Sequence, residues 1–204
     1  MKWKNRHDFY YRKAKSEGYR SRAAFKLKQI IEKFKVIKGG DVVVDLGAAP
    51  GGWLQVAREK VGEKGFVLGV DIAEIRKLPW RNVKTIKFDI TDPNIVKEIQ
   101  KMLPRRADVL LSDLSPKVTG IWELDHARQI FLSEKALEIA LKILREGGNV
   151  VIKVFQGEMM QEFMEKMKVN FRKTRLFKPP ASRKSSAEIY AIGFSLRREH
   201  HRSC

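Results

Sequence analysis

Cysteine is nearly absent from this sequence of 204 residues, since the only one is Cys204. No disulfide can therefore form within the chain, which is typical of proteins in a reducing compartment. Long apolar stretches are also absent: the longest run, residues 150–155, is interrupted by Lys153, and nothing approaches the ~20 apolar residues of a membrane span. The basic start, residues 1–6, leads into further charge instead of the apolar core of a signal peptide. We expect a soluble, cytoplasmic protein that does not bind a membrane.

Acidic residues are scarce at both ends of the chain. Residues 1–38 contain 13 Lys or Arg and 3 Asp or Glu, residues 166–204 contain 11 and 2, and the stretch between them has a net charge of −1. The whole chain has a formal net charge of +18. The surface of a heat-tolerant protein is one explanation, but such surfaces are enriched in charges of both signs. An excess of one sign favours a polyanionic partner, because each neutralised phosphate releases counterions.

The basic N-terminal segment also carries aromatic residues. Its apolar residues recur at helical spacing from residue 8 to about residue 35, and Gly18 interrupts the pattern, which predicts two short basic helices. Such cations and aromatic rings can bind phosphates and stack on bases, although aromatic residues also pack helices onto a domain. The residues concerned are Lys2, Lys4, Arg6, Arg12, Lys13, Lys15, Arg20 and Arg22, with Trp3, Phe9, Tyr10, Tyr11 and Tyr19.

Beyond this segment, strand and helix patterns alternate. Apolar or alternating runs predict strands over residues 42–46, 66–71, 83–89, 108–113, 149–155, 171–178 and 188–196. Helical patterns cover residues 53–61, 94–103, 124–145 and 158–168, and we expect Gly147 and Gly148 to close the third of these helices. The alternation predicts an α/β fold: a mostly parallel, seven-stranded sheet with helices on both faces and an antiparallel edge strand, the last two strands forming a hairpin. We expect one domain over residues 1–204, with residues 1–38 a basic helical extension packed on it.

Four predicted strands end in an aspartate, namely Asp45, Asp71, Asp89 and Asp113. In a doubly wound sheet, ligands bind beyond the carboxyl ends of the strands, so these side chains should converge on one crevice. Aspartate also caps helices and starts turns. These roles could explain any one of the four aspartates, but they do not explain why all four strands end in one. An acid about 20 residues after a glycine loop is placed to bind ribose hydroxyls, and Asp71 lies 20 residues after Gly51.

A glycine loop, residues 47–52, follows the first predicted strand. Loops of this kind also occur in dinucleotide sites or as tight turns without a ligand. This one departs from the G-x-G-x-x-G spacing of a pyrophosphate site, because Pro50 lies inside it and Asp45 precedes it. Asp45 would repel a pyrophosphate, whereas it suits a cationic ligand. S-adenosylmethionine has an amino group, a sulfonium and no phosphate, so we expect this cofactor, with Asp45 and Gly47 among its contacts.

Residues 150–155 read as a buried parallel strand, apart from Lys153. Burying an ammonium is costly unless it is paired. A lysine at a strand end can also pack its aliphatic stem and extend its ammonium to water, which would explain Lys153 without a catalytic role. Asp113, at the end of a neighbouring strand, could instead supply an ionic partner. Lys153 is therefore a candidate for catalysis.

Four sequence blocks follow one another over nearly the whole chain. They are residues 20–27 (RSRAAFKL), 45–53 (DLGAAPGGW), 112–116 (SDLSP) and 151–157 (VIKVFQG). In identity and order they resemble the signature of the FtsJ/RrmJ family of ribose 2′-O-methyltransferases, of the type named ribosomal RNA large subunit methyltransferase E. The resemblance implies a Rossmann-like class I methyltransferase fold.

The resemblance also implies site residues. The family's catalytic tetrad corresponds to Lys26, Asp113, Lys153 and Glu188, all of which are present. Without the resemblance, Lys26 and Glu188 would pass for surface charges. The implied cofactor contacts are Gly51, Trp53, Asp71, Asp89 and Asp113.

The implied reaction is in-line transfer of a methyl group to the ribose 2′-hydroxyl of a uridine in large-subunit (23S) ribosomal RNA. Lys153 would act as general base or, if charged, would stabilise the developing alkoxide. Methyl transfer needs no metal, and the four histidines lack the spacing of metal ligands. We expect a monomer that acts on ribosomal RNA, within the large subunit.

Other functions remain open at this point. Residues 51–53 resemble the ribosomal branch of the family, whereas residues 10–15 resemble the branch that methylates the tRNA anticodon loop. A non-catalytic RNA-binding factor for ribosome assembly could keep the same fold, although an intact tetrad argues against it. A nicotinamide-dependent oxidoreductase is a third class of function that remains open.

Overall fold

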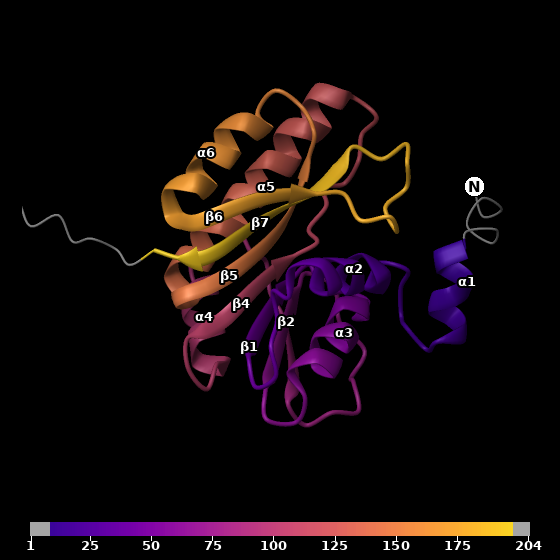
Figure 1. The fold of residues 1–204 in the computed structure, drawn as a ribbon, viewed down its shortest axis with the longest axis vertical. Coiled ribbons are helices and arrows are strands. Elements are labelled where there is room, and N and C mark those ends of the chain that lie inside the picture. The colour runs from indigo at the N-terminus through magenta and orange to yellow at the C-terminus, as the bar shows by residue number, and fades with distance from the viewer. Residues whose placement is uncertain (1–8, 198–204) are drawn as a thin grey trace, which may run out of the picture.

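The computed structural model describes residues 9–197. Helices and strands alternate along the chain in the order that the sequence patterns predict (Figure 1). The elements are α1 Phe9–Ser16, α2 Ala24–Phe34, β1 Val42–Leu46, α3 Gly52–Val61, β2 Phe66–Asp71, β3 Val83–Lys87, α4 Ile95–Met102, β4 Ala107–Ser112, α5 Trp122–Ile143, β5 Leu144–Phe155, α6 Met160–Asn170, β6 Phe171–Phe177 and β7 Glu188–Leu196. Within the described residues, no helix combines the length and the apolar character needed to cross a membrane.

All seven strands belong to one sheet, in the order β3-β2-β1-β4-β5-β7-β6. The pairs that join β3, β2, β1, β4 and β5 are parallel, whereas β7 runs antiparallel to both β5 and β6. This confirms the predicted mostly parallel sheet with an antiparallel pair at one edge. The outermost strand is β6, and the chain then returns to place β7 between β6 and β5. As a result, β7 contributes side chains beside the central strands.

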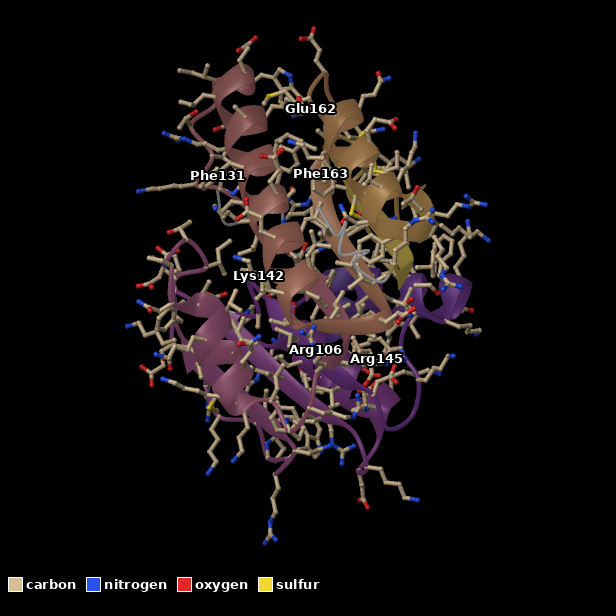
Figure 2. All side chains as sticks on the ribbon, turned by 90° about the vertical axis from the view of Figure 1, so that its left-hand side faces the viewer. Arg106, Phe131, Lys142, Arg145, Glu162 and Phe163 are labelled. Carbon is tan, nitrogen blue, oxygen red and sulfur yellow. The ribbon has the colours of Figure 1, made fainter. Side chains whose placement is uncertain are left out.

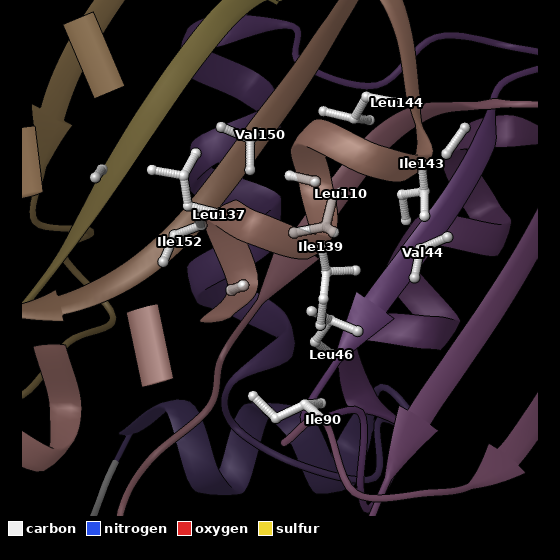
Figure 3. Packing of buried hydrophobic residues seen from close by; sticks show 14 of the residues in the cluster. Val44, Leu46, Ile90, Leu110, Leu137, Ile139, Ile143, Leu144, Val150 and Ile152 are labelled. Carbon is white, nitrogen blue, oxygen red and sulfur yellow. The ribbon is translucent and has the colours of Figure 1, made fainter. Parts of the chain in front are cut away.

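Helices cover both faces of the sheet and bury two separate apolar layers (Figure 1). In β1, Val42, Val44 and Leu46 point into the layer beneath α4, α5 and α6, while Val43 points into the layer beneath α2 and α3. Side chains alternate in this way because of the two-residue repeat of a strand. Figure 3 shows the first layer, where residues of α5 such as Leu137 and Ile139 meet β1, β4 and β5.

The end of α5 differs from the sequence prediction. The helix ends at Ile143, before Gly147 and Gly148, which both lie within the span of β5. Arg106, directly before β4, donates hydrogen bonds to the carbonyl of Lys142, in the last turn, at 3.4 Å and to that of Leu144, directly after the helix, at 2.8 Å (Figure 2). The expectation that the glycines close this helix is wrong, because a side chain from the start of a neighbouring strand closes it instead.

The basic N-terminal segment forms the two short helices α1 and α2. Gly18, between them, has a φ of 75°, a conformation that favours glycine. α2 buries Leu27 and Ile30 against the sheet, and a small apolar cluster around Phe25 holds α1 against α2. The candidate RNA-binding residues Lys2, Trp3, Lys4 and Arg6 lie outside the described residues.

Candidate active site

The candidate site lies at the carboxyl ends of the parallel strands, on the face covered by α2 and α3. Two-residue alternation directs Asp45 on β1 and Lys153 on β5 toward this face, because Val43 and Val151 belong to its apolar layer. Tyr190 on β7 pairs with Lys153 in register and belongs to the same layer. Three strands therefore present polar groups to a single region.

Lys153 is buried, with a side chain only 5% exposed, and three oxygens surround its ammonium. Its Nζ donates to the carbonyl oxygen of Asp113 at 2.8 Å and to Oγ of Ser115 at 2.7 Å, and lies 3.2 Å from Oδ1 of Asp113. Three acceptors match the three N–H groups of a charged lysine. Ser115 is the most exposed of the three groups, so an incoming oxygen can most readily take its place.

Asp113 lies directly after β4 and joins Lys153 to Tyr190. Burial alone would raise the pKa of Asp113, but the positive charges of Lys153 and Lys26 and the hydrogen bonds from Tyr190 and Lys153 hold it below its usual value. The Tyr190 hydroxyl donates to Oδ1 of Asp113 at 2.7 Å. Burial, followed by the charge of Asp113, raises the pKa of Tyr190 well above its usual value, so this phenol stays protonated and acts as a donor.

The other two members of the predicted tetrad form a second ion pair. Lys26 Nζ, from α2, lies 2.5 Å from Oε1 of Glu188, from β7, and both side chains are largely buried, at 12% and 13% exposure. Lys26 Nζ also lies 6.0 Å from the centre of the Tyr190 ring. The structure thus brings the four predicted residues together as two ion pairs beside Tyr190.

Tyr190 was not among the residues selected from the sequence. A signal for it exists, because Glu188 and Tyr190 are two positions apart on a strand and therefore face the same side. Ser115 was also missed, although it lies inside the quoted block that contains Asp113.

The glycine loop, residues 47–52, uses its own backbone groups to hold its shape. The N–H groups of Gly47 and Ala48 donate to the carbonyl of Val70 at 2.9 and 3.2 Å, and that of Ala49 donates to Oδ2 of Asp71 at 2.9 Å. Pro50 has no N–H group to donate. Asp71, predicted as a ribose ligand, therefore also braces the loop.

Two glycines in this loop occupy backbone conformations that other residues rarely adopt. Gly47 has a φ of 76°, and a Cβ at this position would lie 3.0 Å from the side chain and 3.1 Å from the backbone nitrogen of Leu114. Gly51 has a φ of 111°, and a Cβ there would lie 3.0 Å from the guanidinium of Arg20. The loop can thus lie against both neighbours only with glycine at these positions.

Arg20 clamps the glycine loop to a second loop beyond β2. Its Nη1 donates to the carbonyl of Pro50 at 3.1 Å and to that of Arg76 at 2.5 Å, and its Nη2 donates to the carbonyl of Lys77 at 2.8 Å. From the sequence, Arg20 was a candidate for binding RNA phosphates. These contacts give its guanidinium a structural role in holding the glycine loop.

Asp45 is a fully buried acid that forms no ion pair within residues 9–197. Neither of its oxygens has a hydrogen-bond partner among the described residues. Burial raises its pKa well above the usual value, and the negative charges of Asp113 and Asp71 raise it further. Lys153 and Lys26 are already paired with Asp113 and Glu188. One further positive charge would therefore be stabilised next to Asp45, which fits a cationic ligand.

The last two predicted cofactor residues lie in different surroundings. Trp53, at the start of α3, is buried, donates from Nε1 to the carbonyl of Ala23 at 2.8 Å, and packs its ring 5.7 Å from that of Tyr190. Asp89 is exposed two residues beyond β3, and its hydrogen bonds with the N–H and hydroxyl of Thr91 lower its pKa. No group of His, Cys, Asp or Glu side chains within residues 9–197 has the arrangement of a metal site.

The strand order, the glycine loop at the end of β1 and the acids around it define the class: a Rossmann-like α/β methyltransferase fold. Comparisons with known proteins identify the family. The sequence profile described as FtsJ-like methyltransferase matches residues 19–196. The chain belongs to the FtsJ-like methyltransferase family.

Similar proteins agree with this assignment. A protein of Methanothrix thermoacetophila named ribosomal RNA large subunit methyltransferase E is 53% identical over 93% of this chain and 72% of its own length. The protein of the same name from Methanocaldococcus jannaschii is 50% identical over 91% of this chain and 77% of its own length. A crystal structure from Plasmodium falciparum, described as a ribosomal RNA methyltransferase, superposes with a TM-score of 0.78 at 26% identity and covers 87% of this chain and 98% of its own.

Proposed function

We propose that this protein uses S-adenosylmethionine to methylate a ribose 2′-hydroxyl of RNA, and that its substrate is a uridine of large-subunit ribosomal RNA. The observation that carries the proposal is the buried Lys153 ammonium, held between Asp113 and Ser115 next to the glycine loop. The names of the relatives at about 50% identity support ribosomal RNA as the substrate.

The surroundings of the glycine loop fit the cofactor. Asp45, buried and without a hydrogen-bond partner among the described residues, would attract the amino group of S-adenosylmethionine. Gly47 and Gly51 let the loop lie against Leu114 and Arg20. Asp71 and Asp89 would bind the ribose and the base of the cofactor. Trp53 would shape the wall of this site. When bound, the cofactor supplies an electrophilic methyl group on a sulfonium.

The tetrad would position the ribose and stabilise the charge that develops on its oxygen. A ribose hydroxyl that displaces Ser115 from Lys153 would give its proton to a neutral Lys153, or would lose it to water while a charged Lys153 stabilises the developing alkoxide. In either case the oxygen would bond to the methyl carbon as the carbon–sulfur bond breaks. Asp113 would orient Lys153. Lys26, held by Glu188, would place a second positive charge at the same site. In-line displacement depends largely on such positioning.

The site disfavours a nicotinamide dinucleotide. A pyrophosphate is normally held by free N–H groups of the glycine loop, but those of Gly47, Ala48 and Ala49 are already bonded to Val70 and Asp71. The presence of all four residues of the tetrad, arranged as two ion pairs, also argues against a purely RNA-binding assembly factor. The tRNA anticodon loop is the alternative substrate within the family.

One experiment tests the reaction and the substrate together. The protein is incubated with methyl-labelled S-adenosylmethionine and with either undermethylated large ribosomal subunits, free large-subunit RNA or tRNA, and the modified ribose is then mapped. We expect label at a uridine 2′-oxygen of large-subunit RNA. Label in tRNA alone would contradict the substrate, and label on a base would contradict the reaction. No label, together with no heat of cofactor binding by calorimetry, would contradict a methyltransferase.

A further inference from the structure

A partly exposed indole lies at the start of α5, beside the last residue of β5. Trp122 is the first residue of α5, and its side chain is 46% exposed. Its ring stacks on that of His126, with the ring centres 5.4 Å apart and the planes at 17°. The ring of Phe155, at the end of β5, lies 6.2 Å from that of Trp122 at 14°. These three nearly parallel rings form an aromatic platform, and Trp122 is its exposed part.

The aromatic platform adjoins the tetrad by way of a strand and a loop. Phe155 lies two residues beyond Lys153 on β5, a step of about 6.6 Å. Phe155 also pairs in register with Glu188 of the tetrad. The loop that leads to Trp122 includes Ser115, whose hydroxyl accepts a hydrogen bond from Lys153. The platform therefore lies next to the place where the proposed function puts the ribose of the target nucleotide.

A buried aspartate fixes the loop that carries Trp122. Asp125 accepts hydrogen bonds from the N–H and the hydroxyl of Thr119, each at 2.8 Å, and from the N–H of Gly120 at 3.0 Å. Both partners lie directly before α5, and Asp125 lies in the first turn of this helix. The backbone next to Trp122 is thus held from inside the protein, while the indole itself stays exposed.

The histidine that supports the indole is also fixed. His126 is only 5% exposed, and its Nε2 accepts a hydrogen bond from the N–H of Met159 at 3.3 Å. Gly157 lies against it so closely that a Cβ there would be 2.6 Å from the imidazole ring. His126 is therefore held between α5 and the segment after β5. A ring that is already in place loses little conformational entropy when a ligand binds to it.

We propose that Trp122 stacks on a base of the RNA, at or directly beside the nucleotide whose ribose lies at the tetrad. The proposal rests on the proposed function, because that function places an RNA ribose at Lys153. An exposed aromatic ring can stack on any base, since every base has a flat π-face. The net charge of +18 favours such a polyanion as the partner of this surface. Stacking on a base would remove apolar area of the indole from water.

The test removes the aromatic ring and keeps an apolar side chain. Trp122→Leu has no ring at this position, whereas Trp122→Phe keeps one. The matched control is Phe131→Leu, because Phe131 is 48% exposed and, nine residues further along α5, lies on the opposite side of this helix (Figure 2). Binding of an unmethylated transcript of large-subunit RNA is measured over a range of salt concentrations. Calorimetry gives the cofactor affinity, and urea titration checks that each variant is folded.

We expect Trp122→Leu to weaken RNA binding about tenfold, which is typical of the loss of one stacked base. The factor should be the same at every salt concentration, because salt dependence reports phosphate contacts and no charge is removed. Trp122→Phe should lose less than about threefold, since a ring remains, and Phe131→Leu less than about twofold. The cofactor affinity of Trp122→Leu should stay within about twofold of the wild type, because Trp122 lies outside the glycine loop.

Fluorescence tests the contact directly. A base that stacks on an indole quenches its emission. Addition of the RNA transcript should therefore reduce the emission of the wild type more than that of Trp122→Phe, in which this indole is missing. Phe131→Leu should respond to RNA as the wild type does.

Three results would overturn the proposal. The first is a Trp122→Leu protein that binds RNA as tightly as Phe131→Leu. The second is an equal loss of affinity in Trp122→Leu and Trp122→Phe, which would give the indole a structural role only. The third is an equal change in emission in the wild type and in Trp122→Phe. All three come from binding measurements, so a wild type that binds RNA but transfers no methyl group would contradict the proposed function separately.

Discussion

Replacing Lys153 by methionine separates the proposed catalytic role of this residue from its structural role. Methionine keeps most of the volume and the unbranched shape of lysine but removes the charge and all three donors. The side chain at this position could then no longer donate to the Asp113 carbonyl, the Asp113 carboxylate or Ser115. Asp113 would remain buried, with only Lys26 and the Tyr190 hydroxyl to stabilise its negative charge.

The size of the stability effect follows from the geometry. At the 3.2 Å between Lys153 Nζ and Asp113 Oδ1, the Coulomb attraction is about 5 kcal/mol at an effective dielectric constant of about 20. Desolvation offsets part of this attraction, and removing one partner of a buried pair typically costs about 3 to 5 kcal/mol. Since Lys26 and Tyr190 remain, we expect Lys153→Met to lower the free energy of unfolding at neutral pH by about 3 kcal/mol.

The loss should depend on pH. In the wild type, the pKa of Asp113 is lower in the folded state, so its contribution is present above the unfolded pKa of about 3.9 and is lost as the pH falls through the folded value. In Lys153→Met, burial should raise this pKa above the unfolded value. The two proteins should therefore differ least in acid and increasingly as the pH rises toward neutrality.

Two assays separate stability from catalysis. Urea unfolding between pH 4 and 7 gives the free energies, and single-turnover methyl transfer to undermethylated large-subunit RNA gives the rate. We expect Lys153→Met to slow transfer by a factor on the order of 10³, as when a group that stabilises a developing oxyanion is removed. Asp113→Asn added to Lys153→Met removes the unpaired carboxylate, so the double variant should regain most of the stability while staying inactive.

Two outcomes would refute this reasoning. A Lys153→Met protein that keeps most of its rate at saturating cofactor and RNA would show that the ammonium is not central to the reaction. A double variant no more stable than Lys153→Met would show that the buried Asp113 carboxylate is not what destabilises the single variant.

Three further predictions concern the glycine loop. Because the pKa of Asp45 is raised in the free protein, the affinity for the cofactor, measured by calorimetry, should rise with pH. Asp45→Asn should bind the cofactor weakly at every pH and, in urea titrations near neutrality, should unfold at a higher urea concentration than the wild type. A variant whose cofactor affinity depends on pH as it does in the wild type would contradict this prediction. Gly47→Ala should lose about 1 to 3 kcal/mol more stability in urea titrations than Gly18→Ala, since Gly18 has nearly the same positive φ but no atom within 4 Å of the added carbon; equal losses would contradict the contact with Leu114. Arg20→Ala should weaken cofactor binding by about tenfold in calorimetry through loss of its loop contacts, and unchanged affinity would contradict the clamp.

The sequence by itself determined the class of fold and identified most of the polar residues that the structure brings together. Strand and helix patterns have different periods, so their alternation along the chain already implied a parallel sheet with helices on both faces. Parallel strands place their carboxyl ends together, and this is why Asp45, Asp71 and Asp113 could be assigned to one region. The position of Lys153 inside an apolar run was informative for the same reason, because buried charge requires a partner.

The tertiary structure decided which side chains meet across distant parts of the chain. β7 lies between β5 and β6, and only this placement brings Tyr190 beside Lys153 and Asp113. The closing of α5 by Arg106 and the clamping of the glycine loop by Arg20 depend on contacts over many residues, for which local patterns contain no signal. Only the packed structure shows that Asp45 has no hydrogen-bond partner among the described residues. Whether a buried carboxyl group is hydrogen-bonded depends on all the side chains and backbone groups around it, and these come from distant parts of the chain.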